Sequence, residues 1–379
     1  MGGSSFSSPL MQASSIATAV TVFFGFFLDG AESLTTHPSE ARAINSVFKK
    51  WGISAKPNIW NISGEPCSGE AINNAASLLD RKYNPFIKCD CSNDETCHIT
   101  GLMVNELVVG EIPEELWNLT YLSHLNLNYN HLTGSLSPAV GNLTRMKYLV
   151  LGFNALSGEL PKELGNLTEL LSLGLGKTNF SGSIPSELGN LVKLKKLHID
   201  SSGLSGQIPP TFANLINLER VWASDVELTG KIPDFIGNWS KLTLLKLQGN
   251  SFEGKIPSSF SNLKSLTDLR ISEISDGSSL LAFIRNMKFL IVLVLRNNNI
   301  SDSIPSNIGE FQKLTRLDLS FNSITGQIPE SLFNLSSLSS LFLGNNKLSR
   351  PIPTQISQSL LNIDLSYNNL SGRLPSWPN

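Results

Sequence analysis

The chain carries one pattern of apolar and polar positions that returns every 24 residues. Each unit opens on a large apolar residue, at Leu119, Leu143, Leu167, Leu191, Leu215, Trp239, Leu263, Met287, Phe311 and Leu335. The unit of residues 119–142 reads L-x-x-L-x-x-L-x-L-x-x-N-x-L-x-G-x-L-x-P-x-x-G-N. Self-similarity at a fixed period in the twenties predicts a solenoid, in which each unit packs only on its two neighbours.

The spacing of leucine and asparagine within the unit is that of a leucine-rich repeat, so we expect an α/β solenoid with a parallel β-sheet on its concave face. The segment x-x-L-x-L-x-x alternates apolar and polar residues, as a strand with one buried face requires. The third position after the second leucine of that segment carries a ladder of asparagines, where a buried amide can satisfy a turning backbone: Asn130, Asn154, Asn250, Asn298, Asn322, Asn346 and Asn368. The ladder breaks at Thr178, Ser202, Val226 and Ile274, where we expect irregular turns.

The second half of most units carries L-x-G-x-I-P, in which Gly permits a close turn and Pro fixes φ. The unit of residues 263–286 instead has Ile274-Ser275-Asp276-Gly277-Ser278-Ser279, with no Ile-Pro pair. The last two ladder asparagines are only 22 residues apart. We expect the array to bend or loosen at both places.

Residues 16–28 (IATAVTVFFGFFL) form an apolar run that is too short to span a bilayer, and we interpret residues 1–31 as a secretory signal peptide. Apolar residues at helical spacing from Ile44 to Trp51 then predict a short amphipathic helix that begins near Pro38 and ends at Gly52. A solenoid cannot leave the apolar end of its first repeat exposed.

We therefore divide the chain into three parts. The signal peptide is followed by a cysteine-containing N-terminal cap at residues 32–98. Residues 99–379 form the repeat array, with about 11 repeats of which the last is incomplete or uncapped.

Four cysteines, Cys67, Cys89, Cys91 and Cys97, all lie before the repeats. In an oxidising compartment they predict two disulfides, with three possible pairings. The alternative is a zinc site formed by Cys89, Cys91, Cys97 and His98.

Composition argues against several functions. The formal charge is −2 with acidic and basic residues interspersed, which excludes a nucleic-acid-binding surface and a patch for anionic membranes. The five histidines show no metal spacing, and no G-x-S-x-G motif occurs. Gly176-Lys177-Thr178 lacks the glycine that a phosphate loop needs five positions earlier. We predict no catalytic residue, no metal and no cofactor, so the chain is not an enzyme.

Parallel strands roughly 4.8 Å apart would give a recognition face on the order of 50 Å long. The chemically most varied outward positions lie in the middle of the array, and we take them as candidate ligand-binding residues: His198, Asp200, Arg220, Trp222, Ser224, Asp225, Lys246, Gln248, Arg270 and Glu273. An aromatic residue beside mixed charges is typical of an interface hot spot. Trp222 is the strongest single candidate, because an exposed Trp costs solubility unless a partner covers it. The alternative is that these are ordinary solvated strand residues.

Nine sequons predict N-glycosylation at Asn61, Asn118, Asn142, Asn166, Asn179, Asn238, Asn299, Asn334 and Asn369. Five share the column before the first apolar residue of a unit, and three share the column after the ladder position. Every repeat glycan would therefore leave the strand face bare. Because other units carry Asn in the first column without a sequon, that Asn also has a structural role.

Several stretches resemble the ectodomains of plant receptor-like serine/threonine kinases that contain a malectin-like domain. They are Trp60-Asn61-Ile62-Ser63, Pro66-Cys67-Ser68-Gly69-Glu70, Cys89-Asp90-Cys91, Cys97-His98-Ile99-Thr100, residues 136–144, residues 200–206, Pro233-Asp234-Phe235-Ile236-Gly237 and Leu295-Arg296-Asn297-Asn298-Asn299. The resemblance implies plant-specific repeats with a second short sheet. In that family a malectin-like domain, a membrane helix and a cytoplasmic kinase follow the repeats, and none is in this sequence. Compared with the family, we expect a C-terminally truncated chain.

Three hypotheses follow. The preferred one is an extracellular recognition domain of receptor type, secreted or at the cell surface, that binds a peptide, a protein or a co-receptor through its concave strand face. A second is a secreted inhibitor of microbial cell-wall hydrolases, similar to polygalacturonase-inhibiting proteins. A third is a receptor fragment without a role of its own, because no second cysteine-bearing cap closes the array.

Overall fold

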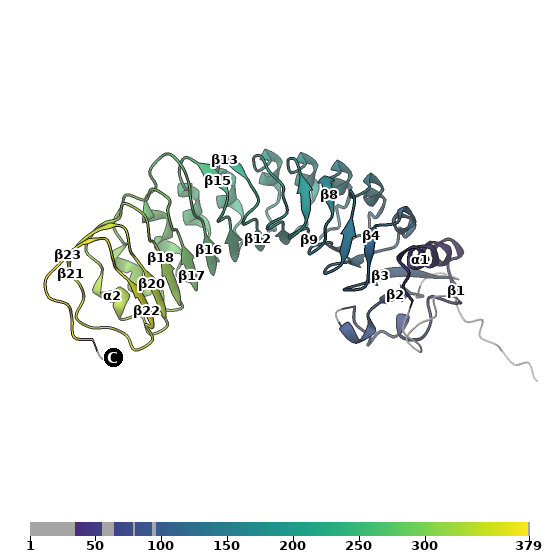
Figure 1. Cartoon of the computed structure of the whole chain (residues 1–379), viewed down its shortest axis with the longest axis horizontal. Helices are drawn as coiled ribbons and strands as arrows, with labels where there is room; N and C mark the ends of the chain where they lie inside the picture. Colours follow the sequence, from purple (N-terminus) through teal and green to yellow (C-terminus); the bar gives the residue numbers. More distant parts are fainter. Residues whose placement is uncertain (1–34, 55–63, 79, 93–95, 378–379) are drawn as a thin grey trace, which may run out of the picture. The chain divides into compact units, whose positions relative to one another are not determined.

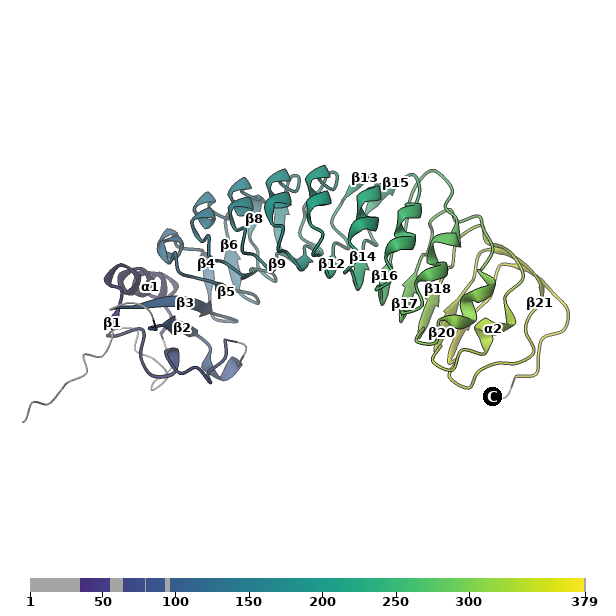
Figure 2. The same cartoon turned by 180° about the vertical axis from the view of Figure 1, so that it is seen from behind.

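Each 24-residue unit folds as one turn of a coil that contains a strand of three residues, a tight turn and a short helix. The computed structural model describes residues 35–54, 64–78, 80–92 and 96–377. All of these residues belong to one compact domain that begins at residue 34. In Figures 1 and 2 strands such as β9, β12, β16 and β17 line one side of the stacked turns, and the helical turns lie away from that side. The predicted signal peptide lies outside the described residues.

The strands of successive turns form one long sheet. Its path is β1 (Thr35–Thr36), β3 (Thr96–Met103), β5 (His124–Asn126), β7 (Tyr148–Val150), β9 (Ser172–Gly174), β11 (Lys196–His198), β12 (Arg220–Trp222), β14 (Leu244–Lys246), β16 (Asp268–Arg270), β17 (Val292–Val294), β18 (Arg316–Asp318), β20 (Ser340–Phe342) and β22 (Asn362–Asp364). Every pair along this path is parallel, and β2 (Phe86–Asp90) adds an antiparallel partner to β3. From β5 to β20, residues 24 positions apart lie side by side, as Leu197 and Val221 do.

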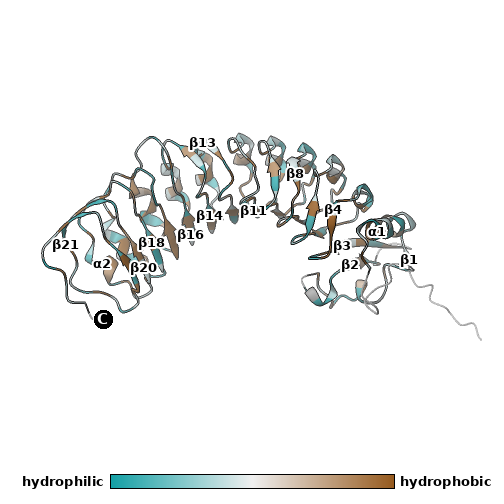
Figure 3. Cartoon of the chain, viewed as in Figure 1, coloured by the Kyte–Doolittle hydropathy of each residue, from teal (hydrophilic) through white to brown (hydrophobic). Residues whose placement is uncertain are grey.

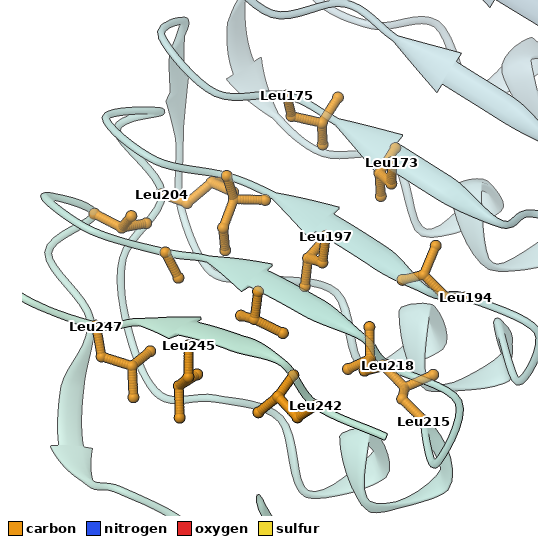
Figure 4. Close-up of a cluster of buried hydrophobic side chains, with 14 of the residues drawn as sticks. Leu173, Leu175, Leu194, Leu197, Leu204, Leu215, Leu218, Leu242, Leu245 and Leu247 are labelled. Atoms are coloured by element: carbon orange, nitrogen blue, oxygen red, sulfur yellow. The ribbon is translucent and has the colours of Figure 1, made fainter. Parts of the chain in front are cut away.

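The core is a set of leucine columns inside the coil. In each unit the central strand residue and the residue two positions later point inward, as Leu245 and Leu247 do, and both are buried. Figure 4 shows these side chains from consecutive turns stacked behind the strands. All ten apolar residues that open the predicted repeats are buried. The predicted leucine-rich-repeat solenoid with a parallel sheet is confirmed.

The asparagine ladder holds neighbouring turns together. Asn250 is buried, and its Nδ2 donates to the carbonyl oxygens of Ala223 in the preceding unit (2.7 Å) and Leu247 in its own (2.8 Å). Its Oδ1 accepts from the N–H groups of Val226 (3.3 Å) and Leu228 (2.9 Å). One side chain therefore satisfies four backbone groups that would otherwise be buried without partners.

The irregular turns expected at the ladder breaks are found after three of the four breaks, just beyond the break residue and not at it. The residue before each break, for example Asp225 with φ 56° or Glu273 with φ 65°, adopts the same left-handed conformation as its counterparts before a ladder Asn. The turn is set by backbone closure and does not need the amide. The irregularity comes next, because Gly203 (φ 77°), Glu227 (φ 63°) and Asp276 (φ 56°) are additional left-handed residues after the breaks at Ser202, Val226 and Ile274. Asn299 (φ 53°) shows the same feature after an intact ladder position.

The second half of the units forms short sheets and helical turns. The short parallel sheets are β4 (Val109–Glu111) with β6 (His131–Thr133), β8 (Ser157–Glu159) with β10 (Asn179–Ser181), β13 (Thr229–Lys231) with β15 (Ser251–Glu253), and β19 (Thr325–Gly326), β21 (Lys347–Pro351) and β23 (Asn369–Ser371). The 3₁₀ helices of the array are η3 (Glu114–Asn118), η4 (Pro138–Asn142), η5 (Lys162–Asn166), η6 (Ser186–Asn190), η7 (Pro210–Asn214), η8 (Asp234–Asn238), η9 (Ser258–Asn262), η10 (Leu281–Asn286) and η11 (Ser306–Glu310), and α2 (Glu330–Phe333) takes their place in a later unit. The second sheet implied by the family resemblance is thus present, in interrupted form.

The segment before the repeats packs on the first turns. Helix α1 (Pro38–Trp51) forms as predicted, and Gly52 ends it in the left-handed conformation (φ 66°). Its Glu40 is buried, accepts from Nδ1 of His98 (2.8 Å) and accepts from the N–H of Ile99 (2.7 Å). The helix is therefore joined to strand β3. The other short helices here are η1 (Gly69–Ala71) and η2 (Arg81–Tyr83).

The two predicted disulfides are present, and the structure selects one of the three pairings: Cys67 with Cys89 and Cys91 with Cys97. The zinc alternative is wrong, because these bonds consume all four thiols. Within the described part of the chain, no helix is long and apolar enough to cross a bilayer.

The last strand leaves its inward residues only partly covered. Leu341 and Leu343 of the β20 unit are buried, whereas Ile363 and Leu365 of the β22 unit are half-buried. Trp377 packs near Phe333, with ring centroids 5.7 Å apart. The packing of strand β22 is thus looser than that of β20.

Candidate ligand-binding strand face

The outward side chains of the long sheet form columns that the 24-residue register dictates. His198, Trp222, Lys246 and Arg270 are direct neighbours on consecutive strands from β11 to β16. Both apolar and polar residues occur along the strands (Figure 3). Because of this register, His198, Trp222, Lys246 and Arg270, four of the ten predicted binding residues, share one row across the middle of the array.

This row is held by a chain of contacts. The rings of His198 and Trp222 have centroids 4.7 Å apart, and Nζ of Lys246 lies 4.5 Å from the Trp222 ring centroid. Asp268 then lies 3.8 Å from that Nζ and accepts two hydrogen bonds from Arg270, of 2.8 and 3.0 Å. Cation–π contacts and a bidentate guanidinium–carboxylate pair fix the side chains in place.

Burial changes the acid–base behaviour of this row. It lowers the pKa of His198, while the Asp200 carboxylate opposes the shift. It also lowers the pKa of Lys246, and the nearby Arg270 charge acts in the same direction. The ring of His198 is consequently neutral at pH 7 and presents a hydrogen-bonding group without a charge.

Trp222 differs from its prediction. Its ring is half-buried between His198 and Lys246 rather than exposed, and its Nε1 is buried without a hydrogen-bond partner in the described structure. The Oε1 of Gln248 is in the same state. A buried donor and a buried acceptor without partners each carry a desolvation cost of about 1–3 kcal/mol.

Of the other six predicted residues, only Arg220 is a strand residue. Asp200, Ser224 and Gln248 lie two positions beyond the ends of their strands and are half-buried. Asp225 and Glu273 are exposed in the left-handed turns, and Arg220 is the exposed first residue of β12. The carboxylates of Asp225 and Glu273 are therefore at turns and not on the strands themselves. At the matching turn position Gly249 has φ 69°, and a Cβ there would stand 2.0 Å from Oδ1 of Asp225.

The sequence analysis identified Arg270 on β16 but missed Asp268 on that strand and the outward residues of the next two strands. Each of β16, β17 and β18 has two outward residues, and the register sets them in two rows: Asp268, Val292 and Arg316 in one, and Arg270, Val294 and Asp318 in the other. Arg316 is 3.5 Å from Asp318, so each flanking strand carries its own arginine–aspartate pair, in reversed order. Two half-buried valines thus lie between two ion pairs.

Aromatic contacts continue toward the N-terminal end of the array. Tyr129 and Phe153 are exposed, stack with ring centroids 4.2 Å apart, and both have positive φ. Nζ of Lys177 lies 5.7 Å from the Phe153 ring centroid and 3.9 Å from Asp200. Their positive φ belongs to the turn position that is left-handed throughout the array, and it places both rings on the exposed surface beside the strands.

The predicted glycosylation sites lie on other surfaces. Asn61 is outside the described residues. The other eight asparagines are exposed, and Asn118, Asn142, Asn166 and Asn238 are the last residues of 3₁₀ helices. Asn334 follows helix α2 directly. None of the eight is an outward residue of the long sheet.

Models of leucine-rich repeats match most of the array. A leucine-rich repeat region model matches residues 95–207, and leucine rich repeat models match residues 241–263, 288–348 and 359–379. Two probable LRR receptor-like serine/threonine-protein kinases of Arabidopsis thaliana are 61% and 59% identical over 94 residues, which is 24% of this chain and 9% of each relative. The chain thus matches only a small part of these relatives.

Solved structures of plant receptors share the fold. The ectodomain of the receptor kinase GASSHO1/SCHENGEN3 from Arabidopsis thaliana, in complex with CASPARIAN STRIP INTEGRITY FACTOR 2, is 35% identical with a TM-score of 0.65, over 73% of this chain and 36% of that one. The PEPR1–AtPEP1 structure is 27% identical with a TM-score of 0.70, over 89% of this chain and 49% of that one. The plant peptide hormone receptor RGFR1, in complex with RGF2, is 31% identical with a TM-score of 0.63, over 72% of this chain and 48% of that one. This chain is therefore a leucine-rich-repeat protein with the fold of plant receptor-kinase ectodomains.

Proposed function

We propose that the chain is an extracellular recognition domain that binds a peptide or protein through its strand face, in a cell-surface signalling context. The observation that carries this proposal is the continuous surface from His198 to Asp318. This surface combines the ring of Trp222, which packs between His198 and Lys246, with two valines and two arginine–aspartate pairs. Interfaces that bind tightly have an apolar, aromatic centre within a polar rim.

Each part of this surface has a distinct role in the proposal. Trp222 is held from both sides, so little side-chain entropy is lost when a ligand covers it. Val292 and Val294 receive an apolar side chain of the ligand. Arg270 and Arg316 lie on the strands at either side of the valines and orient the ligand's backbone or polar groups. The paired charges cost little to hold in water and disfavour ligands with unmatched charge.

Three further points support the proposal. The structures of similar fold include receptors in complex with peptide ligands. The exposed sequons lie away from the strand face, so glycans there would leave it accessible. The cap and repeats resemble those of receptors with a malectin-like domain, which supports the proposal that the chain is the recognition portion of a plant receptor kinase of that subfamily.

The test uses a displayed library of random 12-residue peptides, selected on the immobilised chain. Selected peptides are measured against Trp222→Ala, Arg270→Glu and Val292→Asp, and against Lys264→Glu, an exposed position that follows η9 on another surface. We expect most peptides to bind the three strand-face variants at least about tenfold more weakly and the control as tightly as wild type. If most peptides bind all four variants equally, the strand face is not the binding surface.

The inhibitor hypothesis makes a different prediction. Inhibition of a fungal polygalacturonase by the purified chain, lost in Trp222→Ala, would show that the same face recognises an enzyme. The receptor hypothesis expects no inhibition.

A further inference from the structure

The unit that lacks Ile-Pro opens a groove on a surface separate from the strand face. The groove has a volume of about 710 Å³ and is lined by residues from three consecutive units, within 231–234, 254–261 and 277–283. Its size is within the range of small-molecule sites, roughly 300–1,000 Å³. The residues described above as the ligand-binding face do not line it.

The sequence departure explains the groove. In neighbouring units the isoleucine of Ile-Pro is buried, with Ile232, Ile256 and Ile304 at most 5% exposed. At the corresponding place in this unit Leu280 is 59% exposed, and Leu281 fills the interior instead. The segment before it turns through two left-handed residues, Asp276 and Gly277. The chain path is displaced, and an apolar side chain is left in the groove wall.

The groove also carries positive charge. Lys231 and Lys255 occupy the same column in adjacent units and both line it. Cγ of Lys231 lies 3.5 Å from where a Cβ of Gly254 would stand, so this side chain lies along the groove edge. Neither lysine forms an ion pair with any described residue. Asp234 is the one carboxylate among the described lining residues, which leaves a net positive lining.

We propose that this groove binds a small amphipathic organic acid, with its anionic head between Lys231 and Lys255 and its apolar body against Leu280, Ala282 and Phe283. Two ammonium groups that lack carboxylate partners favour an oxyanion. An exposed leucine beside a buried phenylalanine offers apolar surface that a ligand can cover. This site is independent of peptide recognition by the strand face.

The test uses 1-anilinonaphthalene-8-sulfonate, a fluorescent amphipathic anion, on the whole chain. We expect saturable binding that octanoate displaces and 1-octanol does not. The double variant Lys231→Gln/Lys255→Gln should bind the probe at least about tenfold more weakly, while Lys264→Gln/Lys347→Gln, which also removes two exposed lysines, should bind it normally. Ala282→Trp should fill the groove and block the probe.

Several results would overturn the site. The site is wrong if Lys264→Gln/Lys347→Gln loses as much probe affinity as Lys231→Gln/Lys255→Gln, or if the latter loses none. It is also wrong if Ala282→Trp binds the probe fully, or if octanoate and 1-octanol displace the probe equally. The last result would mean that only an exposed apolar surface, such as the partly covered interior of strand β22, takes up the probe. Circular dichroism of Ala282→Trp checks that the array remains folded.

Discussion

Replacing Asn250 by alanine tests the physical reason for the repeat. The four hydrogen bonds of its side chain join the backbones of two units, and the residue is 6% exposed. In Asn250→Ala, two carbonyl oxygens and two N–H groups lose their partner at a place that water cannot easily reach. Each hydrogen bond contributes about 1 kcal/mol, and the backbone groups left without a partner carry a further desolvation cost. We therefore expect the free energy of unfolding to fall by about 3–5 kcal/mol.

The chain offers a matched control at a natural ladder break. Thr178 is buried, and its hydroxyl makes one ladder bond, a donation of 2.8 Å to the carbonyl oxygen of Leu175. Thr178→Val keeps the shape of the side chain and removes that bond alone, so it should cost only about 1 kcal/mol. The difference between the two variants therefore measures how much of the ladder is hydrogen bonding.

Urea unfolding monitored by circular dichroism gives the free energy of unfolding of each variant. Hydrogen exchange shows which backbone N–H groups lose protection. In Asn250→Ala the N–H groups of Val226 and Leu228 should exchange faster, because both donate to the missing Oδ1. They should be unchanged in Thr178→Val. If Asn250→Ala costs no more than Thr178→Val, or if those two N–H groups keep their protection, the ladder does not act as argued here.

Three further predictions concern the cap and the strand face. Breaking the buried pair with His98 by Glu40→Ala should destabilise the cap by about 3–5 kcal/mol, measured as faster proteolysis before the first repeat. Removing the Cys67–Cys89 disulfide by a double Ser variant should cost about 3 kcal/mol, since it closes a loop of 22 residues, and a melting curve checks this. Burial holds the pKa of His198 below its ordinary 6.5, so the unfolded chain protonates first; stability should be constant above about pH 6.5 and fall below it, less steeply in His198→Asn.

The fold follows from the sequence because inward positions obey a simple rule. A leucine that returns every 24 residues must lie beside its counterparts, and the buried Leu173, Leu197 and Leu245 show this directly. The sequence did not predict that the left-handed residue is kept before each ladder break, because we assigned the turn to the asparagine. The left-handed residue before it is what closes the turn, and residues as different as Lys177 and Phe153 adopt that conformation.

The candidate binding face was only half predictable for a related reason. Alternation identified Trp222 and Arg270 as outward, but each residue was judged alone. The same 24-residue register also makes Asp268, Val292 and Arg316 neighbours, and laying the strands side by side would have found them. What the sequence could not supply is side-chain direction: the carboxylate of Asp268 reaches across to Lys246, and the ring of Trp222 lies half-buried rather than free.

The two proposed sites differ in how they depend on the fold. Arg270 forms an ion pair with Asp268 in which both side chains are partly exposed, so replacing Arg270 should cost only about 0–1 kcal/mol of stability, change binding and leave folding intact. The groove arises from a change in which residue fills the core, because the side chain of Leu281 is buried there while that of Leu280 is exposed. Its shape is therefore tied to the packing of that unit. Restoring an Ile-Pro pair at residues 280–281 should close the groove and leave the strand face unchanged, which separates the two sites in one variant.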